Sequence, residues 1–293
     1  MKGGHDIRVV HGGGDLIGEC PVWNVDEQAL YWVDTRRPSV QRADREGQVR
    51  TWLLPFGIGS FAFRERGGLI AGMERGFCTI DLETGAVTLV ADPEPGRNDT
   101  RLNDGRCDPR GRFWCGSRDE AGASPKGALY RLDPDFSCHR MDEGFIISNG
   151  MAFSPKAPVM IFGDSTGETI YRYDFDAETG SISNRAVYLD TRHLPWRVDG
   201  AAFDDEGYYW CALVRDWSIG RFDSAGRLDR LIRLPVRLPT MCAFGGPDLD
   251  VLYVTSSRLL LDDEERPGQP LAGSLFAIHG LGVRGLPPAR FAG

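Results

Sequence analysis

Residues Leu30–Asp34 read LYWVD, a run of aromatic and β-branched side chains that is typical of a buried β-strand. Runs of the same character recur at LIAGM (Leu69–Met73), RFWCG (Arg112–Gly116), MIFGD (Met160–Asp164), YYWCA (Tyr208–Ala212) and LYVTS (Leu252–Ser256). Their central residues stand 38 to 48 residues apart along the chain. A repeat of this length indicates a fold built from repeated units.

A second strand follows each of these runs after a polar turn. The second strands are predicted at residues 39–42, 76–80, 128–132, 169–173, 219–222 and 274–278. Further polar turns, such as Asp81–Gly85, Asp174–Gly180 and Asp223–Gly226, commonly lead to a third strand. Three or four antiparallel strands per repeat are typical of a β-propeller, whereas ankyrin or TPR repeats of similar length would be helical.

Six such repeats account for the whole chain. We therefore predict an all-β fold, a single six-bladed β-propeller domain spanning residues 1–293. Average domain sizes alone would also allow two domains, but the repeats leave no room for a second. The early strand Ile7–Val10 is expected to pair with the last blade, which would cover an exposed sheet edge.

Composition argues against several classes of partner. The formal net charge of −8, from 34 basic and 42 acidic residues, disfavours nucleic acid. No apolar run approaches the about 20 residues that cross a bilayer, and Met1–Gly14 lacks a signal-peptide pattern. We therefore expect a cytoplasmic protein without a membrane partner. A propeller pairs its own strand edges, so a monomer is the default expectation.

The cysteines and histidines do not form a recognisable metal or disulfide pattern. Cysteines occur at 20, 78, 107, 115, 138, 211 and 242, and none of them is spaced C-x-x-C. This odd, scattered set indicates free buried thiols. The five histidines are dispersed as well, which argues against a zinc finger or an H-E-x-x-H hydrolase.

Four polar motifs stand at comparable places between the repeats, and each ends in a residue typical of turns. They are Gly18-Glu19-Cys20-Pro21, Arg101-Leu102-Asn103-Asp104-Gly105, Ser148-Asn149-Gly150 and Val198-Asp199-Gly200. Taken singly, Asn-Gly and Asp-Gly are ordinary hairpin signals. Because a propeller gathers loops from every blade at one end of its channel, we expect these motifs to converge. Together they offer carboxylate and amide oxygens, which a hard divalent cation prefers.

We predict that Glu19, Asn149 and Asp199 bind a divalent metal ion. Two carboxylates balance the charge of such an ion, and three protein ligands leave positions open for water and substrate. An open metal ion polarises a carbonyl and lowers the pKa of bound water, and Asp199 is the predicted catalytic base. The chemistry implied is hydrolysis. Ca²⁺ is the expected ion, with Zn²⁺, Mg²⁺, Mn²⁺ and Fe²⁺ as alternatives.

As an ordered set, these and other motifs make the sequence resemble the gluconolactonase, regucalcin and senescence-marker family of six-bladed propellers. The residues that carry the resemblance are 18–21, 101–105, 111–117, 127–133, 149–155, 199–200, 210–213, 243–248 and 252–256. The resemblance covers nearly the full chain and implies metal-dependent hydrolysis of sugar-acid lactones. It also implies that Asn103 completes or borders the metal site, that Arg101 and Asn103 hold substrate hydroxyls, and that Glu120 stands on a substrate loop.

Three arginines near the predicted site depart from the family pattern. Arg118 stands where a methionine is common, and Arg215 lies in a segment where glycine or tryptophan is common. Arg197 adds a third positive charge. Arginines are usually solvated surface residues. Because guanidinium groups bind carboxylate, phosphate or sulfonate bidentately, we predict that all three bind substrate and that the lactone carries an anionic group.

Three alternatives were weighed against an aldonolactone hydrolase. Gly163–Gly167 matches the G-x-S-x-G nucleophile elbow, but Glu168–Phe175 continues as a strand where that elbow needs a helix, so Ser165 is not the predicted nucleophile. A non-catalytic calcium-binding regulator of the regucalcin type would use the same metal site, yet Arg101 and Asn103 favour turnover. Organophosphate or aryl-ester hydrolases and strictosidine-synthase-like lyases share the propeller fold alone.

Overall fold

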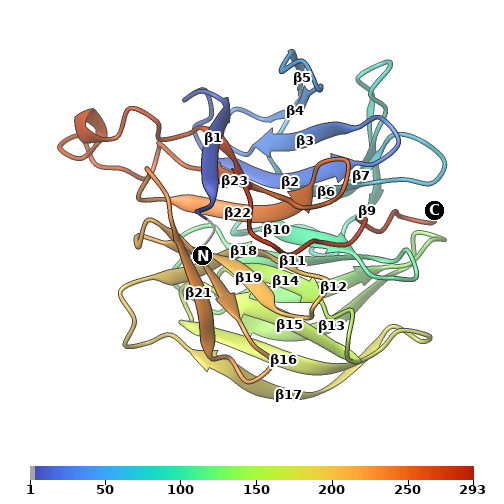
Figure 1. Ribbon diagram of the computed structural model, residues 1–293. Coiled ribbons are helices and arrows are strands. Elements are labelled where there is room, and N and C mark those ends of the chain that lie inside the picture. The colour runs from blue at the N-terminus through green and yellow to red at the C-terminus, as the bar shows by residue number, and fades with distance from the viewer. Residues whose placement is uncertain (1–3) are drawn as a thin grey trace. The chain divides into compact units, whose positions relative to one another are not determined.

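The computed structural model describes residues 4–293. Its strands form six four-stranded sheets, and the only helical segment in this range is a short 3-10 turn, η1 (Arg266–Gly268). No helix among these residues is long and apolar enough to span a membrane. Each sequence repeat supplies one sheet, which confirms the predicted all-β, six-bladed β-propeller (Figure 1).

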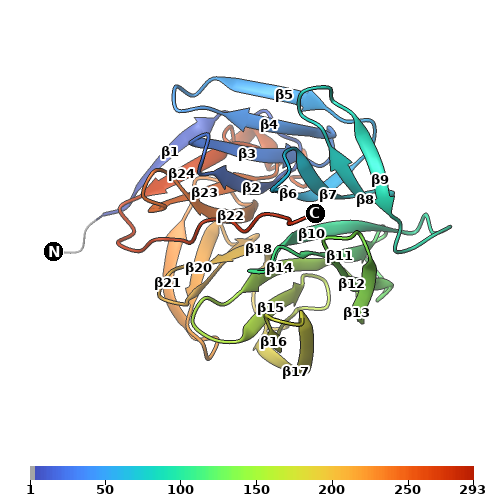
Figure 2. The same ribbon diagram turned by 90° about the vertical axis from the view of Figure 1, so that its right-hand side faces the viewer.

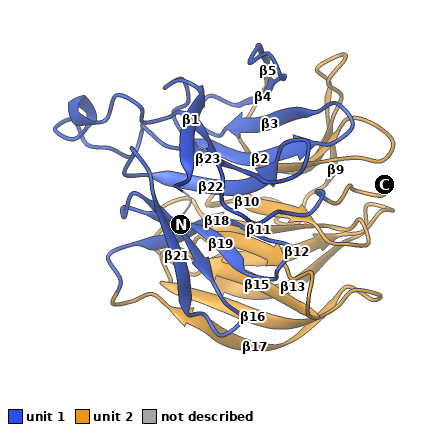
Figure 3. Cartoon of the chain, viewed as in Figure 1, with its two compact units in different colours: residues 1–51, 194–288 blue, residues 52–193, 289–293 orange. Residues whose placement is uncertain are grey.

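The chain divides into two compact units, which Figure 3 shows in different colours. Unit 1 comprises residues 1–51 and 194–288, and unit 2 comprises residues 52–193 and 289–293. Each unit is built on three of the six sheets. That residues 1–293 form a single domain stays a prediction.

Unit 1 holds the first sheet and the last two. The first contains β2 (Gly18–Asn24), β3 (Ala29–Asp34), β4 (Ser39–Ala43) and β5 (Val49–Leu53), whose last two residues fall in unit 2. The next contains β18 (Arg197–Phe203), β19 (Tyr209–Val214), β20 (Ser218–Phe222) and β21 (Leu228–Arg233). The last contains β22 (Pro239–Gly245), β23 (Val251–Ser256), β24 (Leu275–His279) and β1 (Asp6–His11).

Unit 2 holds the three sheets in the middle of the chain. The first contains β6 (Ile58–Phe63), β7 (Leu69–Met73), β8 (Gly76–Ile80) and β9 (Val87–Ala91). The second, whose strands follow in order in Figure 2, contains β10 (Thr100–Cys107), β11 (Phe113–Asp119), β12 (Gly127–Leu132) and β13 (Cys138–Phe145). The third contains β14 (Ser148–Phe153), β15 (Val159–Asp164), β16 (Thr169–Asp176) and β17 (Ser181–Asp190).

The first strand of the chain completes the last sheet, as the sequence predicted. β1 pairs antiparallel with β24, with Ile7 opposite Ile278 and Val9 opposite Phe276. The six predicted second strands correspond to β4, β8, β12, β16, β20 and β24, with ends that differ by a few residues. The repeat in the sequence therefore predicts the positions of the second and third strands in nearly all the sheets.

Tryptophans at equivalent repeat positions anchor three sheets. Trp32, Trp114 and Trp210 are fully buried, and each occupies the second strand of its sheet. Burying one such side chain removes about 200 Å² from water, which stabilises the fold by roughly 5 kcal/mol before the entropy of ordering is counted.

Aspartates fix the turns that precede two of these tryptophans. Asp108 and Asp204 open a D-x-x-G-x-x-W sequence, and each accepts a hydrogen bond from the indole N–H, of Trp114 and Trp210 respectively, at 2.9 Å. The same carboxylates also accept backbone N–H groups of their own turns. Gly207 has a φ of 89°, a conformation that glycine adopts without strain.

The four polar motifs lie in the first strand of their sheets, so their predicted placement between the repeats is wrong. They occupy parts of β2, β10, β14 and β18. In each of these strands the pairing register shifts at the motif, as in a β-bulge. Gly150 has a φ of 63°. A tight turn and a bulge use the same left-handed backbone, so the local signal does not distinguish them.

We expect Asp204→Ala to lower the free energy of unfolding by about 3 kcal/mol. Asp204 is completely buried and accepts hydrogen bonds from Trp210 and, at 2.8 Å, from the buried guanidinium of Arg221. The alanine leaves both donors without this acceptor. Urea unfolding followed by tryptophan fluorescence measures the loss. Asp223→Ala, in the β20–β21 turn, is the control and should cost about 1 kcal/mol or less. Equal losses in the two variants would contradict this account.

Candidate functional site

Each predicted metal ligand stands at the irregular point of a first strand. Glu19 in β2 and Asp199 in β18 belong to unit 1, and Asn103 in β10 and Asn149 in β14 belong to unit 2. The register shifts directly at or beside each of them. Bulges re-aim a side chain out of the regular alternation of a strand and are frequent beside active sites. The repeat thus places four polar side chains at the same irregularity: Glu19 and Asn149 are the last paired residues before it, and Asn103 and Asp199 follow the last paired residue.

Unit 2 brings Asn103 and Asn149 together. The Nδ2 atom of Asn103 donates to Oδ1 of Asn149 at 3.0 Å and to the carbonyl oxygen of Ser148 at 2.8 Å. Gly59 in β6 supports Asn103 from the neighbouring sheet, because a Cβ at position 59 would lie 2.4 Å from the Asn103 carbonyl oxygen. Only glycine fits there, so the backbone of Asn103 is held from a second side.

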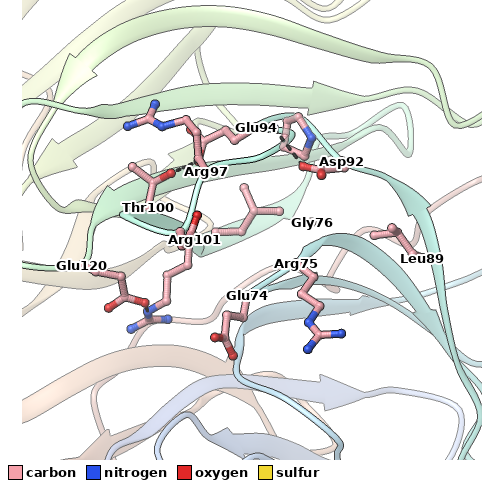
Figure 4. A pocket seen from close by; sticks show the side chains of 13 residues that line it. Glu74, Arg75, Gly76, Leu89, Asp92, Glu94, Arg97, Thr100, Arg101 and Glu120 are labelled. Carbon is pink, nitrogen blue, oxygen red and sulfur yellow. Dashed lines mark hydrogen bonds and ion pairs between the residues drawn. The ribbon is translucent and has the colours of Figure 1, made fainter.

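Unit 2 also brings Arg101 and Glu120 together, beside a pocket of about 380 Å³. The Nε atom of Arg101 lies 2.9 Å from Oε1 of Glu120. Arg101 is buried and Glu120 is half-buried. Figure 4 shows their charged groups facing each other, and Glu74 and Arg75 line the same pocket. This volume lies within the range of about 300–1,000 Å³ that is typical of small-molecule pockets.

Glu94, which also lines the pocket, is a residue that the sequence motifs missed. Its carboxylate accepts hydrogen bonds from the hydroxyls of Ser117 at 2.7 Å, Tyr130 at 2.9 Å and Thr100 at 2.5 Å. Burial and the charge of Glu94 raise the pKa of Tyr130 above its usual range, so this phenol remains a donor. The three bonds tie the segment before β10 to β10, β11 and β12, next to Arg101. Glu94 is recognisable as a residue of the pocket only from these contacts in the folded chain, because no sequence motif contains it.

Two of the predicted substrate arginines occupy one face of unit 2. Arg118 in β11 pairs with Arg101 in β10, so the two side chains leave the same face of the sheet. Its Nε atom donates to the carbonyl oxygen of Asp119 at 3.3 Å. Like charges directly opposite each other destabilise a sheet, and Glu120 offsets part of that repulsion. A bound anion would offset more of it.

Arg197 and Arg215 lie at the same end of the β18–β19 hairpin in unit 1. Arg197 pairs with Val214, the residue immediately before Arg215. Arg215 is exposed and has a φ of 77°. This left-handed backbone costs a non-glycine residue about 1–2 kcal/mol, which explains why glycine is the simpler choice at this place. Trp217, two residues further on, has a φ of 57°, so the turn holds two such residues.

The donor chemistry of Asn149 suits a hard cation. Its Nδ2 atom donates to Oγ of Ser165 at 2.8 Å, so the side chain turns its carbonyl oxygen towards Asn103. Across residues 4–293, no three His, Cys, Asp or Glu side chains gather closely enough to hold a metal ion. The predicted set has only two carboxylates and takes its other oxygens from amides. The predicted set is therefore not a cluster of three or more His, Cys, Asp or Glu side chains.

The seven cysteines are all free, which confirms the expectation from their spacing. Six are buried, and Cys138 is half-buried. Burial raises the pKa of Cys115 to about 12 and the pKa values of Cys78 and Cys138 to about 11. These thiols stay protonated at neutral pH and are poor nucleophiles.

Asp119 clamps the loop that carries Glu120. One carboxylate oxygen accepts the backbone N–H groups of Ala123 at 2.9 Å and Ser124 at 3.0 Å. The other lies 3.0 Å from Nζ of Lys126. The Ala123 bond, followed by the Lys126 contact, lowers the pKa of Asp119 to about 2. The loop therefore depends on an ionised Asp119.

These sheets, with polar residues at the bulges of their first strands, are those of a known family. Residues 17–258 match the SMP-30/gluconolactonase/LRE-like region, and the chain belongs to this family. The predicted resemblance is thereby confirmed.

Relatives match the chain over nearly its whole length. It is 39% identical over 280 residues to the 6-deoxy-6-sulfogluconolactonase of Pseudomonas putida, covering 95% of this chain and 96% of the relative. It is 34% identical over 286 residues to regucalcin of Sus scrofa, covering 94% and 95%. A solved structure of the calcium-binding protein regucalcin from Agrobacterium tumefaciens has a TM-score of 0.92 at 26% identity, covering 97% and 96%.

We expect Asp119 to contribute a loss of stability as the pH falls from about 4 to about 2. Its usual pKa of 3.8 is lowered to about 2 in the folded chain. Its stabilisation is therefore complete above the higher value and disappears as the folded carboxyl takes up a proton. Urea unfolding at several pH values in this range, on wild type and Asp119→Asn, measures the difference. The variant should lack this part of the pH dependence, and identical slopes would contradict the assignment.

Proposed function

We propose that this protein hydrolyses the lactone of a sugar acid, preferably one with an anionic substituent such as a sulfonate, using one divalent metal ion. The full-length similarity at 39% identity to a relative named 6-deoxy-6-sulfogluconolactonase supports this substrate class. The observation that carries the proposal is the Arg101–Glu120 pair at the pocket of unit 2. A buried, oriented guanidinium suits the hydroxyls of a sugar ring.

Glu19, Asn149 and Asp199 are the proposed metal ligands, and Asn103 completes or borders their site. When bound, the ion would polarise the lactone carbonyl and make a coordinated water more acidic. Ca²⁺ is the proposed ion, because the solved regucalcin relative is described as calcium-binding. The amide orientation of Asn149 supports its role as an oxygen donor.

The remaining site residues bind the substrate and move a proton. Arg101 donates to the lactone hydroxyls, and Glu120 holds its guanidinium through Nε. Asn103 accepts a hydroxyl through Oδ1, because its Nδ2 already donates to Ser148 and Asn149. Asp199 accepts a proton from the attacking water as the new carbon–oxygen bond forms. The ester bond of the ring then breaks, and its oxygen takes up a proton, so that water and lactone give one aldonic acid.

Arg118, Arg197 and Arg215 are the proposed partners of the anionic substituent. The repulsion between Arg118 and Arg101 on one sheet face and the strained backbone of Arg215 both support this assignment. A sulfonate accepts hydrogen bonds from guanidinium groups in the same manner as a phosphate. We further propose that the protein is a cytoplasmic monomer. The sequence has no apolar run of about 20 residues, and a propeller pairs its own strand edges.

Acid release from aldonolactones tests the activity. Chelator-stripped protein with single metals restored should hydrolyse the substrate only when a metal is present, after spontaneous hydrolysis is subtracted. Asp199→Asn should lower kcat at least about 100-fold, because it removes the general base and one carboxylate ligand. Full activity of that variant would refute the mechanism. Tight calcium binding without turnover on any lactone would favour the alternative of a regulator, which the similarity to regucalcin makes the second candidate.

Substitution of the arginines tests the substrate preference. Arg118→Met and Arg215→Gly should each lower kcat/KM for a 6-sulfo lactone about 10-fold or more and change that for neutral gluconolactone less than about twofold. Arg215→Gly also relieves backbone strain, so loss of folding does not confound it. Arg140→Met, on the exposed strand β13, is the control. Equal changes for charged and neutral lactones would refute this role.

A further inference from the structure

The G-x-S-x-G sequence at residues 163–167 belongs to a β-hairpin. β15 ends at Asp164 and β16 begins at Thr169, so Ser165 stands in the turn between two strands. No helix follows, which confirms that this is not a nucleophile elbow. Ser165 is nevertheless buried, and the proposed chemistry leaves it without a role.

Strand register places Ser165 beside Asn149. Asn149 of β14 pairs with Gly163 of β15, and residues directly opposite each other share a face of the sheet. Ser165 is two residues further along, in the turn that follows β15. Gly163 has no side chain between them. The contact follows directly, with Nδ2 of Asn149 donating to Oγ of Ser165 at 2.8 Å.

Asp164 fixes this turn to the strand that carries Asn149. Its carboxylate accepts the backbone N–H groups of Ile146 at 2.7 Å and of Ile147 and Gly167, both at 2.9 Å. The backbone N–H of Ser165 donates in turn to the carbonyl oxygen of Ile147 at 2.9 Å. A Cβ at Gly167 would lie 2.4 Å from the Asp164 carboxylate. The turn and the start of β14 are thus one rigid piece.

A chain of hydrogen bonds decides which way the Asn149 amide faces. A carbonyl oxygen only accepts, so the Asn103 atom 2.8 Å from the carbonyl oxygen of Ser148 is its amide nitrogen. That nitrogen is also 3.0 Å from Asn149, so the Asn149 atom in contact is its oxygen. The amide nitrogen of Asn149 must then face the other way, towards Ser165.

We propose that Ser165 is a positioning residue that, together with the Nδ2 group of Asn103, holds the Asn149 amide with Oδ1 directed away from the turn, so that a metal ion would meet an oxygen there. This inference rests on the proposed function in one respect, the role of Asn149 as a ligand. An amide nitrogen with its two hydrogens is a donor and does not bind a cation. A reversed amide would therefore present the wrong atom. Groups that orient a metal ligand commonly change metal affinity about 10- to 100-fold.

Calorimetry of divalent-ion binding to the chelator-stripped full chain tests this role. Ser165→Ala should bind Ca²⁺ about 10-fold more weakly than wild type, and turnover should rise again as the metal concentration is increased. Ser137→Ala, at a half-buried serine in the β12–β13 turn, is the matched control and should bind as wild type does. Unchanged affinity in Ser165→Ala overturns the proposal. Turnover that no metal concentration restores, with unchanged affinity, would show that Ser165 acts on the substrate and not on the metal ligand, and would also overturn the proposal.

A second pair of variants separates orientation from general support of the fold. The two oxygens of a carboxylate are equivalent, so Asn149→Asp presents an oxygen whichever way its side chain turns. Adding Ser165→Ala to Asn149→Asp should therefore change the dissociation constant less than about twofold, against about 10-fold in the Asn149 background. Equal losses in both backgrounds would show a structural effect only and overturn the proposal.

The side-chain amide signal of Asn149 gives a readout that needs no metal. In ¹⁵N-labelled metal-free protein, Asn149→Asp identifies this signal by its disappearance. The signal should be protected from hydrogen exchange in wild type and lose that protection in Ser165→Ala. An unprotected signal in wild type overturns the inference. If wild type binds no divalent ion, the proposed function fails, and the amide signal still decides whether Ser165 orients Asn149.

Discussion

The interruption of strand pairing in the first strand of every sheet is the constraint on which the proposed site depends. The register shifts in β2, β6, β10, β14, β18 and β22. Four of these strands carry the predicted ligands, and the other two support them. In unit 2, Gly59 of β6 lies against Asn103. In unit 1, Thr240 of β22 donates to the carbonyl oxygen of Gly18, next to Glu19, at 2.6 Å. Each irregular first strand therefore either carries a predicted ligand or contacts the segment that carries one.

Aspartates at the ends of second strands hold these irregular segments in place. Asp34 accepts the backbone N–H groups of Leu16 and Ile17, which precede β2. Asp164 makes the same contacts to the two residues that precede β14. The two ligand strands, one in each unit, are thus clamped by the same device. These N–H groups stand just before β2 and β14, ahead of the bulges, so the carboxylates fix where each ligand strand begins.

Charged side chains of both signs surround the pocket of unit 2. Arg101 and Arg118 leave one sheet face together, and Glu120 and Glu94 hold the surrounding segments by an ion pair and by hydroxyl hydrogen bonds. Glu74 and Asp92 add further carboxylates to the lining, and Arg75 and Arg97 add further guanidinium groups. The proposed preference for an anionic lactone therefore depends on direct contact between an arginine and the substituent, because charge-assisted hydrogen bonds are stronger than neutral ones.

The sequence by itself determined the number and kind of the sheets. The strand runs recur at a regular period, and the alternation of apolar residues that forms a strand is local, so it can be read without the fold. The same reading identified the family and the pairing of the first strand with the last sheet. It placed the motifs around Asn149 and Asp199 between the repeats, because Asn-Gly and Asp-Gly are typical of turns, whereas both motifs lie within first strands. Only the tertiary structure decided that Arg118 faces Arg101, that Glu94 binds three hydroxyls and that Ser165 contacts Asn149. These contacts depend on register between strands and on residues far apart in the chain, and no local pattern encodes them.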